Sequence, residues 1–368
     1  MSEFTAEDHV YMARALQLAR YGLYTTHPNP RVGCVLVQAG QIVGEGWHER
    51  AGQPHAEVFA LHAAGARAPG ATAYVSLEPC SHYGRTPPCA EALVEAKVAK
   101  VIAAMVDPNP LVAGQGLQRL QAAGIETAAG LLAVEARALN PGFISMMERQ
   151  RPFVRIKMAM SLDGRTAMAS GESVWITGEA ARRDVQFWRA QAGAVLTGID
   201  TVLMDNPQLN VRLTAQELGI SGEVRQPVRV VLDSKLRFPL DAALLKTTGK
   251  VLIYTCSVDE EKIALLQNLG LQVRQFAGKR LDLTEVLRAL VTEGINEVHV
   301  EAGATLSGQL IEQGLADELV LYMAPHLMGS AARPLFNLPL AQMAERYALT
   351  IRDMRAVGQD WRILADFN

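Results

Sequence analysis

The sequence contains few cysteines, and those that it has are widely separated. Four are present in 368 residues, at positions 34, 80, 89 and 256. A disulfide framework is typical of shorter chains that are denser in cysteine, so we exclude a disulfide-stabilised fold. Cys34 and Cys256 lie in or directly after apolar runs, which predicts that both are small buried residues at strand positions. Cys80 and Cys89 remain as candidates for metal binding.

Long apolar runs and an excess of positive charge are also absent. No run approaches the length of a membrane span, and the N-terminus lacks the charged, apolar and small-residue regions of a secretory signal. Basic residues number 35 against 38 acidic ones, which gives a formal net charge of −3 and no broad positive field. We therefore expect a cytoplasmic protein whose partners include neither a membrane nor a nucleic acid.

The composition predicts globular domains without repeats or low-complexity tracts. Hydrophobic residues make up 49% and charged residues 20%, close to the average for globular proteins. A chain of 368 residues exceeds the size at which one hydrophobic core usually keeps growing, so two domains are expected. The turn-forming residues 140–142 and the charged stretch 148–152 indicate a boundary near residue 150. We predict domains at 1–150 and 151–368.

Helical and strand-like patterns alternate in both halves, which predicts two α/β domains. In the first half, helices are expected up to about residue 21, from near residue 54, over 114–123 and over 133–148. The strands expected there are 32–38, 41–47, 71–77 and 100–106. The strands expected in the second half are 153–160, 193–197, 228–232, 250–255, 297–301 and 317–323.

One histidine, one glutamate and two cysteines form a candidate metal site in the first half. His55 and Glu57 stand at the start of an expected helix, Cys80 follows a strand-like run, and Cys89 comes nine positions later. One imidazole and two thiolates suit tetrahedral zinc with the fourth position left to water, as in a catalytic site. A carboxylate two residues from the histidine can accept that water's proton and pass it to a leaving amine. This H-x-E…P-C…C arrangement matches the zinc nucleobase deaminases.

Other interpretations of these residues are weaker. Taken singly, a histidine beside a carboxylate is usually a capped surface or core residue, and two cysteines can be incidental. A structural zinc module for protein interaction would leave Glu57 without a role. The main alternative is a zinc deaminase of another nucleoside or of nucleic acid, with the second half as a binding domain. The net charge argues against it, as does the lack of an interleaved basic and aromatic stripe.

Several further motifs give the first half a family resemblance over residues 8–145. They are THPNP at 26–30, VGC at 32–34, GEGWH at 44–48, PHAE at 54–57 and EPCSH at 78–82. With them, this half closely resembles the deaminase domain of the bifunctional riboflavin-biosynthesis deaminase/reductases. The eight residues between Cys80 and Cys89, where most nucleobase deaminases have two, fit that family.

The resemblance implies a fold, a substrate and binding residues for the first half. It implies a cytidine-deaminase-like three-layer α/β/α domain that removes a ring amino group from a diaminohydroxypyrimidine bearing a phosphoribosylamino group. Asn29, His48 and Arg85 match positions that hold the substrate. Arg85 stands where some members have lysine, which keeps a cation for an anionic phosphate.

Signals from the residues themselves are softer in the second half. Residues 297–301 predict a strand that runs through a glycine-containing turn at 302–303 into a helix. The free amides of such a turn favour phosphate, although a purely structural turn explains the glycine equally well. Arg182, Arg183 and Arg189 fall on an expected helix, where a solvated face is the usual explanation.

The order of short motifs gives this half, over residues 152–366, a resemblance to the same family's reductase domain. They are Lys157, SLDGRTA at 161–167, WITG at 175–178, RRDV at 182–185, TVL at 201–203, DNP at 205–207 and EAG at 301–303. The resemblance implies a dihydrofolate-reductase-like α/β domain that uses NADPH to convert the ribosyl side chain into a ribityl chain. Residues 213–290 carry no motif that we can assign, which is compatible with a scaffold.

The resemblance also implies residue roles in the second half. Lys157 matches a lysine that assists the reduction. The positions that match substrate-binding residues are Ser173, Arg189, Leu209, Arg212 and Glu301. The positions that match cofactor-binding residues are Ala159, Trp175, Thr201, Asp205, Gly303, Ala304, Thr305, Leu306, Ser307, Gly308 and Gln309. The sequence departs from the family's pattern at residues 199–200, where small residues are common, and at Asn210, where threonine is frequent. These departures concern contacts with the cofactor and the substrate.

Together these observations predict a bifunctional enzyme with Zn²⁺ and NADPH as cofactors. Glu57 and Lys157 are the expected catalytic residues, and His55, Cys80 and Cys89 the expected metal ligands. The expected partner is a small phosphorylated pyrimidine. We also expect the chain to form a homo-oligomer through the reductase domain.

Overall fold

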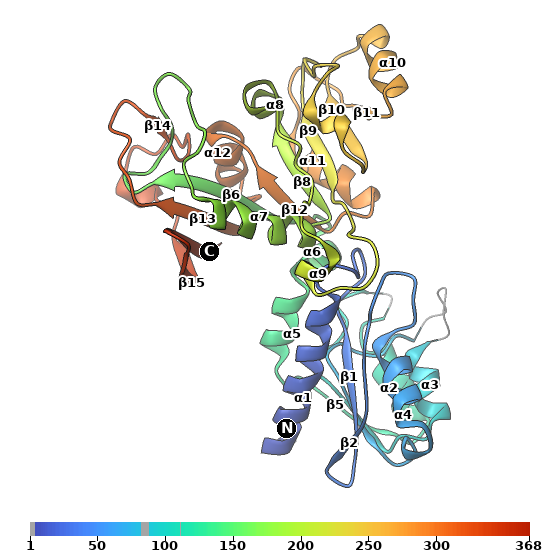
Figure 1. Cartoon of the computed structure of the whole chain (residues 1–368). Helices are drawn as coiled ribbons and strands as arrows, with labels where there is room; N and C mark the ends of the chain where they lie inside the picture. The colour runs from blue at the N-terminus through green and yellow to red at the C-terminus, as the bar shows by residue number, and fades with distance from the viewer. Residues whose placement is uncertain (1–3, 82–87, 111) are drawn as a thin grey trace. The chain divides into compact units, whose positions relative to one another are not determined.

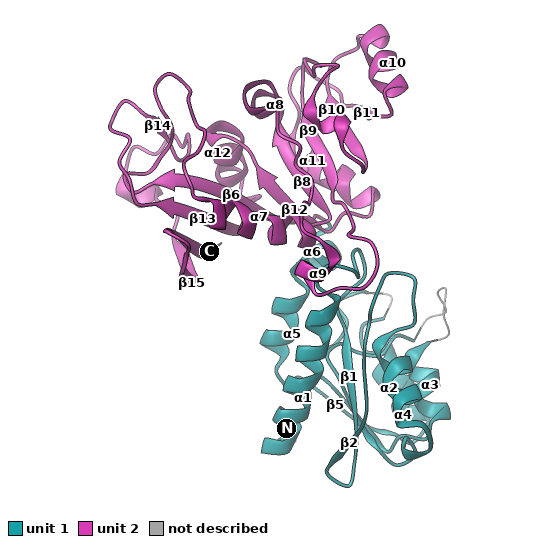
Figure 2. Cartoon of the chain, viewed as in Figure 1, with its two compact units in different colours: residues 1–150 teal, residues 151–368 magenta. Residues whose placement is uncertain are grey.

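The computed structural model describes residues 4–81, 88–110 and 112–368. The chain divides into two compact units, Met1–Gln150 and Arg151–Asn368 (Figure 2). Within the described ranges, none of the helices has the length and apolar character that a membrane span requires.

The first unit is built on a five-stranded sheet with strand order β2-β1-β3-β4-β5. Its strands are β1 Gly33–Gln38, β2 Gln41–Trp47, β3 Thr72–Val75, β4 Lys100–Ala103 and β5 Glu126–Ala129. β1 pairs antiparallel with both β2 and β3, whereas β3, β4 and β5 run parallel. Alternate residues of β1 therefore enter different cores, with Cys34 and Leu36 on one face and Val35 and Val37 on the other.

Helices cover both faces of this sheet (Figure 1). The helices of this unit are α1 Ala6–Ala19, α2 Ala56–Ala64, α3 Cys89–Glu95, α4 Gln115–Ala122, α5 Ala133–Leu139 and α6 Pro141–Arg149, with the short 3₁₀ turns η1 Arg20–Gly22 and η2 Gly65–Arg67. α2, α3 and α4 pack on one face, and α1, α5 and α6 on the other. The three-layer α/β/α arrangement expected for this half is confirmed.

Some predictions for the first unit were wrong in detail. The single helix expected over 133–148 is two helices, because Pro141 has no N–H to continue α5 and Asn140 before it is non-helical (φ −124°, ψ 45°). The strand expected over 100–106 ends at Ala103. β5 was not predicted, since it is a mostly exposed edge strand without a hydrophobic pattern.

The second unit contains a nine-stranded sheet with strand order β11-β10-β9-β8-β12-β6-β13-β16-β15. Its strands are β6 Phe153–Ser161, β8 Ala194–Gly198, β9 Val228–Leu232, β10 Val251–Thr255, β11 Gln272–Gln275, β12 Glu297–Glu301, β13 Glu318–Ala324, β15 Leu349–Val357 and β16 Asp360–Phe367. The strands from β11 to β13 in this order are parallel, and β16 and β15 continue antiparallel. β7 Arg165–Ala167 and β14 Arg333–Pro334 form a separate two-stranded sheet.

Helices pack on both faces of the nine-stranded sheet. They are α7 Glu179–Gln191, α8 Ile199–Asp205, α9 Ala215–Leu218, α10 Glu260–Asn268, α11 Leu283–Thr292 and α12 Ala304–Glu312, with the 3₁₀ turns η3 Ala243–Lys246 and η4 Met343–Glu345. α11 and α12 pack on one face, and α7, α8 and α10 pack against cores on the other. The second α/β domain is therefore confirmed. β7, β11 and β14 to β16 were not predicted, because most of their residues are exposed or only partly buried and give no regular strand pattern.

Residues 213–290 contribute three strands and the core around Phe238 and Leu244. Arg229 is 1% exposed, and its guanidinium donates to the carbonyls of Leu244 at 3.1 Å and Gly249 at 2.6 Å. One cysteine prediction fails here. Cys34 is fully buried, but Cys256 lies just beyond the end of β10 and is partly exposed.

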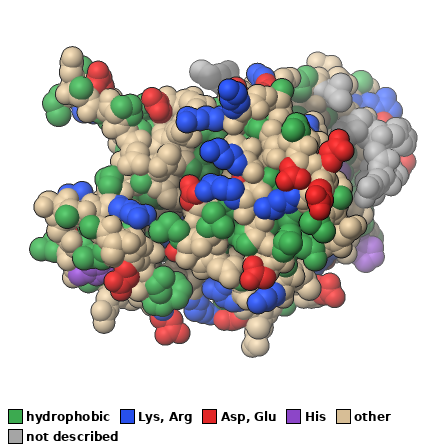
Figure 3. All heavy atoms as spheres, turned by 90° about the horizontal axis from the view of Figure 1, so that it is seen from above, with side chains coloured by type: hydrophobic (Ala, Val, Ile, Leu, Met, Phe, Trp, Pro, Cys, Tyr) green, Lys and Arg blue, Asp and Glu red, His purple; other side chains and the backbone are tan. Residues whose placement is uncertain are grey.

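Basic and acidic side chains are interspersed on the face of the molecule drawn in Figure 3, with hydrophobic side chains between them. That face therefore presents neighbouring charges of both signs, which partly cancel each other's field.

Candidate metal centre and candidate reductase site

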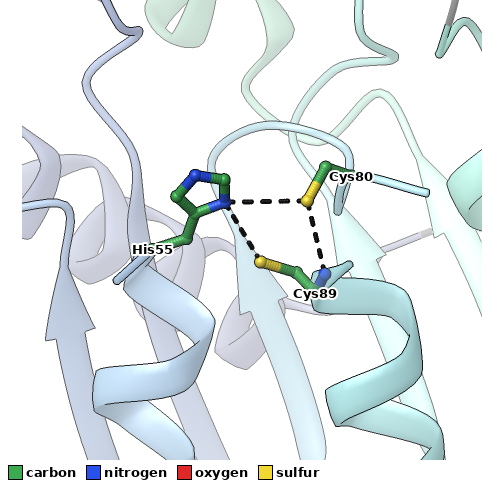
Figure 4. A group of neighbouring side chains, drawn as sticks. All are labelled: His55, Cys80 and Cys89. Carbon is green, nitrogen blue, oxygen red and sulfur yellow. Dashed lines mark hydrogen bonds between the residues drawn. The ribbon is translucent and has the colours of Figure 1, made fainter. Parts of the chain in front are cut away.

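Three side chains predicted as metal ligands meet at the starts of two helices (Figure 4). His55 is the N-cap of α2, Cys89 is the first residue of α3, and Cys80 lies in the loop after β3. His55 Nδ1 lies 3.3 Å from Cys89 Sγ and 3.6 Å from Cys80 Sγ, and the three ligand atoms lie within 4.8 Å of one another. Bond lengths of tetrahedral zinc to nitrogen and sulfur place ligand atoms about 3.5–3.8 Å apart. The residues therefore fit a zinc ion.

The electrostatics of the two thiols suit a metal site. A hydrogen bond from Cys89 lowers the pKa of Cys80 to about 4, and contacts with His55 act in the same direction. The pKa of Cys89 is raised, because it supplies that hydrogen bond and is buried. The pair thus holds one thiolate readily, and a cation between the sulfurs would stabilise the second.

Glu57 lies in the first turn of α2, two residues after His55, and is 3% exposed. Its Oε2 atom is buried and has no hydrogen-bond partner among the residues that the structure describes. Burial raises the pKa of Glu57 to about 7, and the charge of Cys80 acts in the same direction. A carboxyl with this pKa can both accept and donate a proton near neutral pH.

Two residues matched to substrate positions lie beside this group. The His48 ring stands edge-on to the His55 ring, with centroids 5.4 Å apart. His48 Nδ1 lies 3.1 Å from the Pro54 carbonyl and must donate to it, so Nε2 is left to accept from Asn29 Nδ2 at 3.1 Å. Burial lowers the pKa of His48, which favours this neutral tautomer. Arg85, the third residue, lies outside the described residues.

The second candidate site lies on β6 and β12, under α7. The strand register places Glu301 opposite Lys157. Arg189 reaches down from α7 and binds Glu301 through two hydrogen bonds, Nε to Oε1 at 2.5 Å and Nη2 to Oε2 at 2.9 Å. The solvated face expected for the arginines of this helix is therefore wrong for Arg189, which is 8% exposed. Its position on α7 directs it at the sheet, whereas Arg183 is exposed.

Charges at this site perturb one another strongly. Burial alone would raise the pKa of Glu301, but Arg189 and other nearby cations lower it to about 2. Burial lowers the pKa of Lys157, and Glu301 opposes that shift. Burial also lowers the pKa of His299 to about 3. A carboxylate, a lysine of reduced basicity and a neutral histidine therefore share this side of the sheet.

Of the residues matched to cofactor positions, Thr201 and Asp205 lie on α8 and the stretch 303–309 spans the N-cap and first turns of α12, whereas Ala159 lies on β6 and Trp175 precedes α7. α8 and α12 each begin directly after a parallel strand, β8 and β12, with a glycine at the N-cap that offers no side-chain acceptor. A Cβ at Gly198 would lie 3.5 Å from Leu306, so the starts of the two helices are neighbours. The carboxyl edge of parallel strands, with free helix amides, is where α/β folds bind phosphorylated ligands.

The other residues matched to substrate and cofactor positions differ in burial and in their contacts. Ser173 Oγ lies 3.4 Å from Asp205 Oδ1, and Trp175 is 71% exposed. The Arg212 side chain is exposed, although its backbone N–H donates to Gln186 at 3.0 Å. Leu209 is buried, Ala159 and Thr201 are partly buried, and of the stretch 303–309 only Ser307 and Gly308 are buried. The structure thus brings Arg189, Glu301 and Lys157 together, with Arg212 close enough to interact with their charges.

Sequence reasoning missed His299 and Glu297, which lie on the same side of β12 as Glu301. His299 is fully buried, and its Nε2 lies 3.7 Å from Glu301 Oε1. Glu297 is buried with Arg155 of β6, and their closest oxygen and nitrogen are 3.6 Å apart. Every second residue of β12 is polar in an otherwise apolar strand, and that alternation was the signal that could have identified them.

Family models match both units. Residues 5–105 match the cytidine and deoxycytidylate deaminase zinc-binding region, and residues 152–363 match the RibD C-terminal domain. Among curated proteins, the Escherichia coli riboflavin biosynthesis protein RibD is 50% identical over 360 residues, which is 96% of this chain and 98% of that protein.

Solved structures of riboflavin biosynthesis proteins are also similar to this chain over nearly its whole length. The structure of Acinetobacter baumannii RibD is 49% identical with a TM-score of 0.91, and covers 98% of this chain and 99% of its own. A diaminohydroxyphosphoribosylaminopyrimidine deaminase/5-amino-6-(5-phosphoribosylamino)uracil reductase from Thermotoga maritima is 31% identical with a TM-score of 0.86, and the matched shares are 98% and 99%.

Proposed function

Since this chain belongs to the RibD family of riboflavin biosynthesis proteins, we propose that its two units divide the family's two reactions between them. The chain is a bifunctional enzyme, a zinc-dependent pyrimidine deaminase and an NADPH-dependent reductase. We assign deamination of diaminohydroxyphosphoribosylaminopyrimidine to residues 1–150. Reduction of the ribosyl side chain of the deaminated product is assigned to residues 151–368.

For deamination, the observation that carries the proposal is the group formed by His55, Cys80 and Cys89 with Glu57 beside it. These three residues would hold zinc, which when bound supplies a Lewis acid that lowers the pKa of water. Glu57 accepts a proton from the attacking water and returns it to the amino group that leaves as ammonia. Asn29, His48 and Arg85 bind the substrate.

His48 has a defined part in this scheme because its tautomer is set. Its Nε2 lone pair accepts one N–H of Asn29 Nδ2, and the second N–H of that amide can donate to the substrate. His48 therefore orients Asn29, whose amide group can recognise a pyrimidine edge beside the metal centre.

For reduction, we assign Lys157 as the residue that assists proton transfer while NADPH supplies the hydride. Glu301 and Arg189 lie beside Lys157 and are assigned to substrate binding. Ser173, Leu209 and Arg212 are the other residues assigned to substrate binding. The residues assigned to NADPH are Ala159, Trp175, Thr201, Asp205 and the stretch 303–309. Support comes from the free amides at the start of α12, which suit the cofactor's phosphates.

The alternative of a nucleoside or nucleic-acid deaminase with a C-terminal binding domain is not retained. The match of residues 152–363 to the RibD C-terminal domain makes the second unit a member of a reductase family. A small molecule is therefore the substrate of both units.

Two wider properties belong to this proposal. A homo-oligomer through the second unit is supported by edge strand β15, which exposes Leu349, Ile351 and Met354. A location in the cytoplasm is supported by the metal ligands Cys80 and Cys89, because cysteines that bind zinc as thiolates must be kept reduced.

The test is mass spectrometry of the purified full-length protein with the phosphoribosylaminopyrimidine. Deamination exchanges an amino group for oxygen, and subsequent addition of NADPH should yield a second product that has gained two hydrogens. No change of mass in either incubation would contradict the proposed function. Sedimentation or light scattering tests the oligomer, and a monomer at micromolar concentration would contradict that part.

A further inference from the structure

Glu78, the first residue of the EPC motif at 78–80, has no role in either of the two proposed reactions. It is 3% exposed, and its carboxylate accepts hydrogen bonds from four backbone N–H groups. Oε2 accepts from Asp107 at 3.0 Å and Gly114 at 2.9 Å, and Oε1 accepts from Gly116 at 2.9 Å and Leu117 at 3.2 Å.

These four N–H groups stabilise the negative charge of the buried Glu78 carboxylate. In the part of the chain that the structure describes, no lysine or arginine forms an ion pair with Glu78. Gly116 and Leu117 lie in the first turn of α4, where N–H groups have no partner within the helix and the helix dipole favours a negative charge. The carboxylate therefore acts as the cap that α4 does not receive from its own N-cap residue, Gly114.

The same contact brings α4 against the chain that leads to Cys80. A Cβ at Gly116 would lie 1.9 Å from the Pro79 carbonyl oxygen, so the two backbones pack in direct contact. On the other side, the Cys80 carbonyl accepts from Ala90 N in α3 at 3.1 Å. Residues 79 and 80 are thus held between the first turns of α4 and α3.

We propose that Glu78 is a positioning residue of the metal centre. By fastening the start of α4 to Pro79, its carboxylate sets where Cys80 Sγ stands relative to His55 Nδ1 and Cys89. This inference rests on the proposed function, which makes Cys80 a metal ligand. Glu78 itself touches neither metal nor substrate and acts only through the backbone of residues 79 and 80.

The substitution Glu78→Gln isolates this role because it preserves shape. A glutamine has one oxygen that can accept, whereas its NH₂ group would face two N–H donors and break their hydrogen bonds. Partners that orient metal ligands typically change metal affinity by about 10–100-fold when they are removed. We expect E78Q to bind zinc at least about tenfold more weakly than the unmodified protein.

The experiment uses the full-length protein after removal of metal with a chelator. Zinc affinity is measured by competition with a chromophoric chelator, and Co²⁺ is added separately to record its visible bands, which report thiolate geometry. Gly116→Ala is the second variant, since it keeps Glu78 but pushes α4 away from Pro79. The matched control is Tyr74→Phe, which removes a hydrogen bond of 2.6 Å to Asp8 in the same unit but on the opposite face of the sheet.

The proposal predicts weaker zinc binding and altered cobalt bands in E78Q and G116A, with neither change in Y74F. Unmodified affinity and bands in E78Q, even with reduced thermal stability, would overturn it and leave Glu78 a structural residue. If E78Q fails to fold, G116A decides in the same way. Cys80→Ser tests the ligand assignment. Full zinc retention there overturns the proposed function, whereas zinc loss there with unchanged affinity in E78Q overturns this inference alone.

Discussion

Arg189 on α7 forms a bidentate ion pair with the carboxylate of Glu301 on β12, although the two residues are 112 positions apart in the sequence. Both side chains are largely buried, with 9% and 12% of their surface exposed. A buried pair of this kind leaves an uncompensated charge when either member is removed. The pair therefore belongs to the reductase site that we propose, and we expect it also to stabilise the second unit.

Arg189→Ala should lower the free energy of unfolding of the second unit by about 3–5 kcal/mol, because the Glu301 carboxylate stays buried without its partner. Chemical denaturation measures this, with deamination by the same protein as an internal reference. The matched control is Arg183→Ala on the same helix, whose ion pair with Glu217 is exposed and whose loss should leave stability unchanged. Equal effects of the two substitutions would contradict the prediction.

Glu57→Gln should keep its metal and deaminate at least about a hundredfold more slowly, since the amide preserves shape but cannot carry a proton. Metal content by atomic spectroscopy and product formation by mass spectrometry are the two measurements. NADPH oxidation with deaminated substrate should be unchanged. A variant that deaminates at the unmodified rate would remove Glu57 from the proposed mechanism.

Removal of the metal should abolish deamination and spare reduction, because the ligand group lies wholly within the first unit. The protein is treated with a chelator, each reaction is assayed separately, and zinc is then restored. Recovery of deamination on addition of zinc is the control for irreversible damage. Loss of reduction in the metal-free protein would show that the two reactions depend on each other.

Glu301→Gln should shift the pH dependence of reduction. The negative charge of Glu301 raises the pKa of Lys157 and so opposes the lowering caused by burial. Without that charge the protonated lysine is less favoured, and its pKa falls further. If protonated Lys157 assists the reaction, the decline of activity at high pH should move to lower pH. Single-turnover NADPH oxidation across pH measures this, and a shift to higher pH would exclude Lys157 as the titrating group.

Arg229→Met should destabilise the second unit by about 2–4 kcal/mol, since several buried carbonyls around Gly249 lose their donor. The midpoint of denaturation measures the loss, and Arg288→Ala on the exposed side of α11 is the control. Unchanged stability would mean that water replaces the guanidinium.

The chemistry of the metal centre was readable from the sequence because it depends on residue types at short spacings. His55 with Glu57 at a helix start, and Cys80 after a strand, predict a catalytic zinc set before any fold is known. The buried parallel strands were also readable, because a continuous apolar run such as β10 is a local property.

Only the tertiary structure decided which polar residues share a site. Pairing of β12 with β6 sets Glu301 opposite Lys157, and α7 brings Arg189 to them. Arg189 follows Ala181 and Val185 at four-residue intervals and so shares their side of α7, which Arg183 does not. Only the packing of α7 on the sheet shows that a charge on this side is buried against Glu301. The same holds for Glu78, whose four amide partners lie 29 to 39 residues further along the chain and meet it only when β3 and β4 pair. Residue type and spacing are encoded locally, whereas contacts between distant segments exist only after strand pairing and helix packing have brought them together.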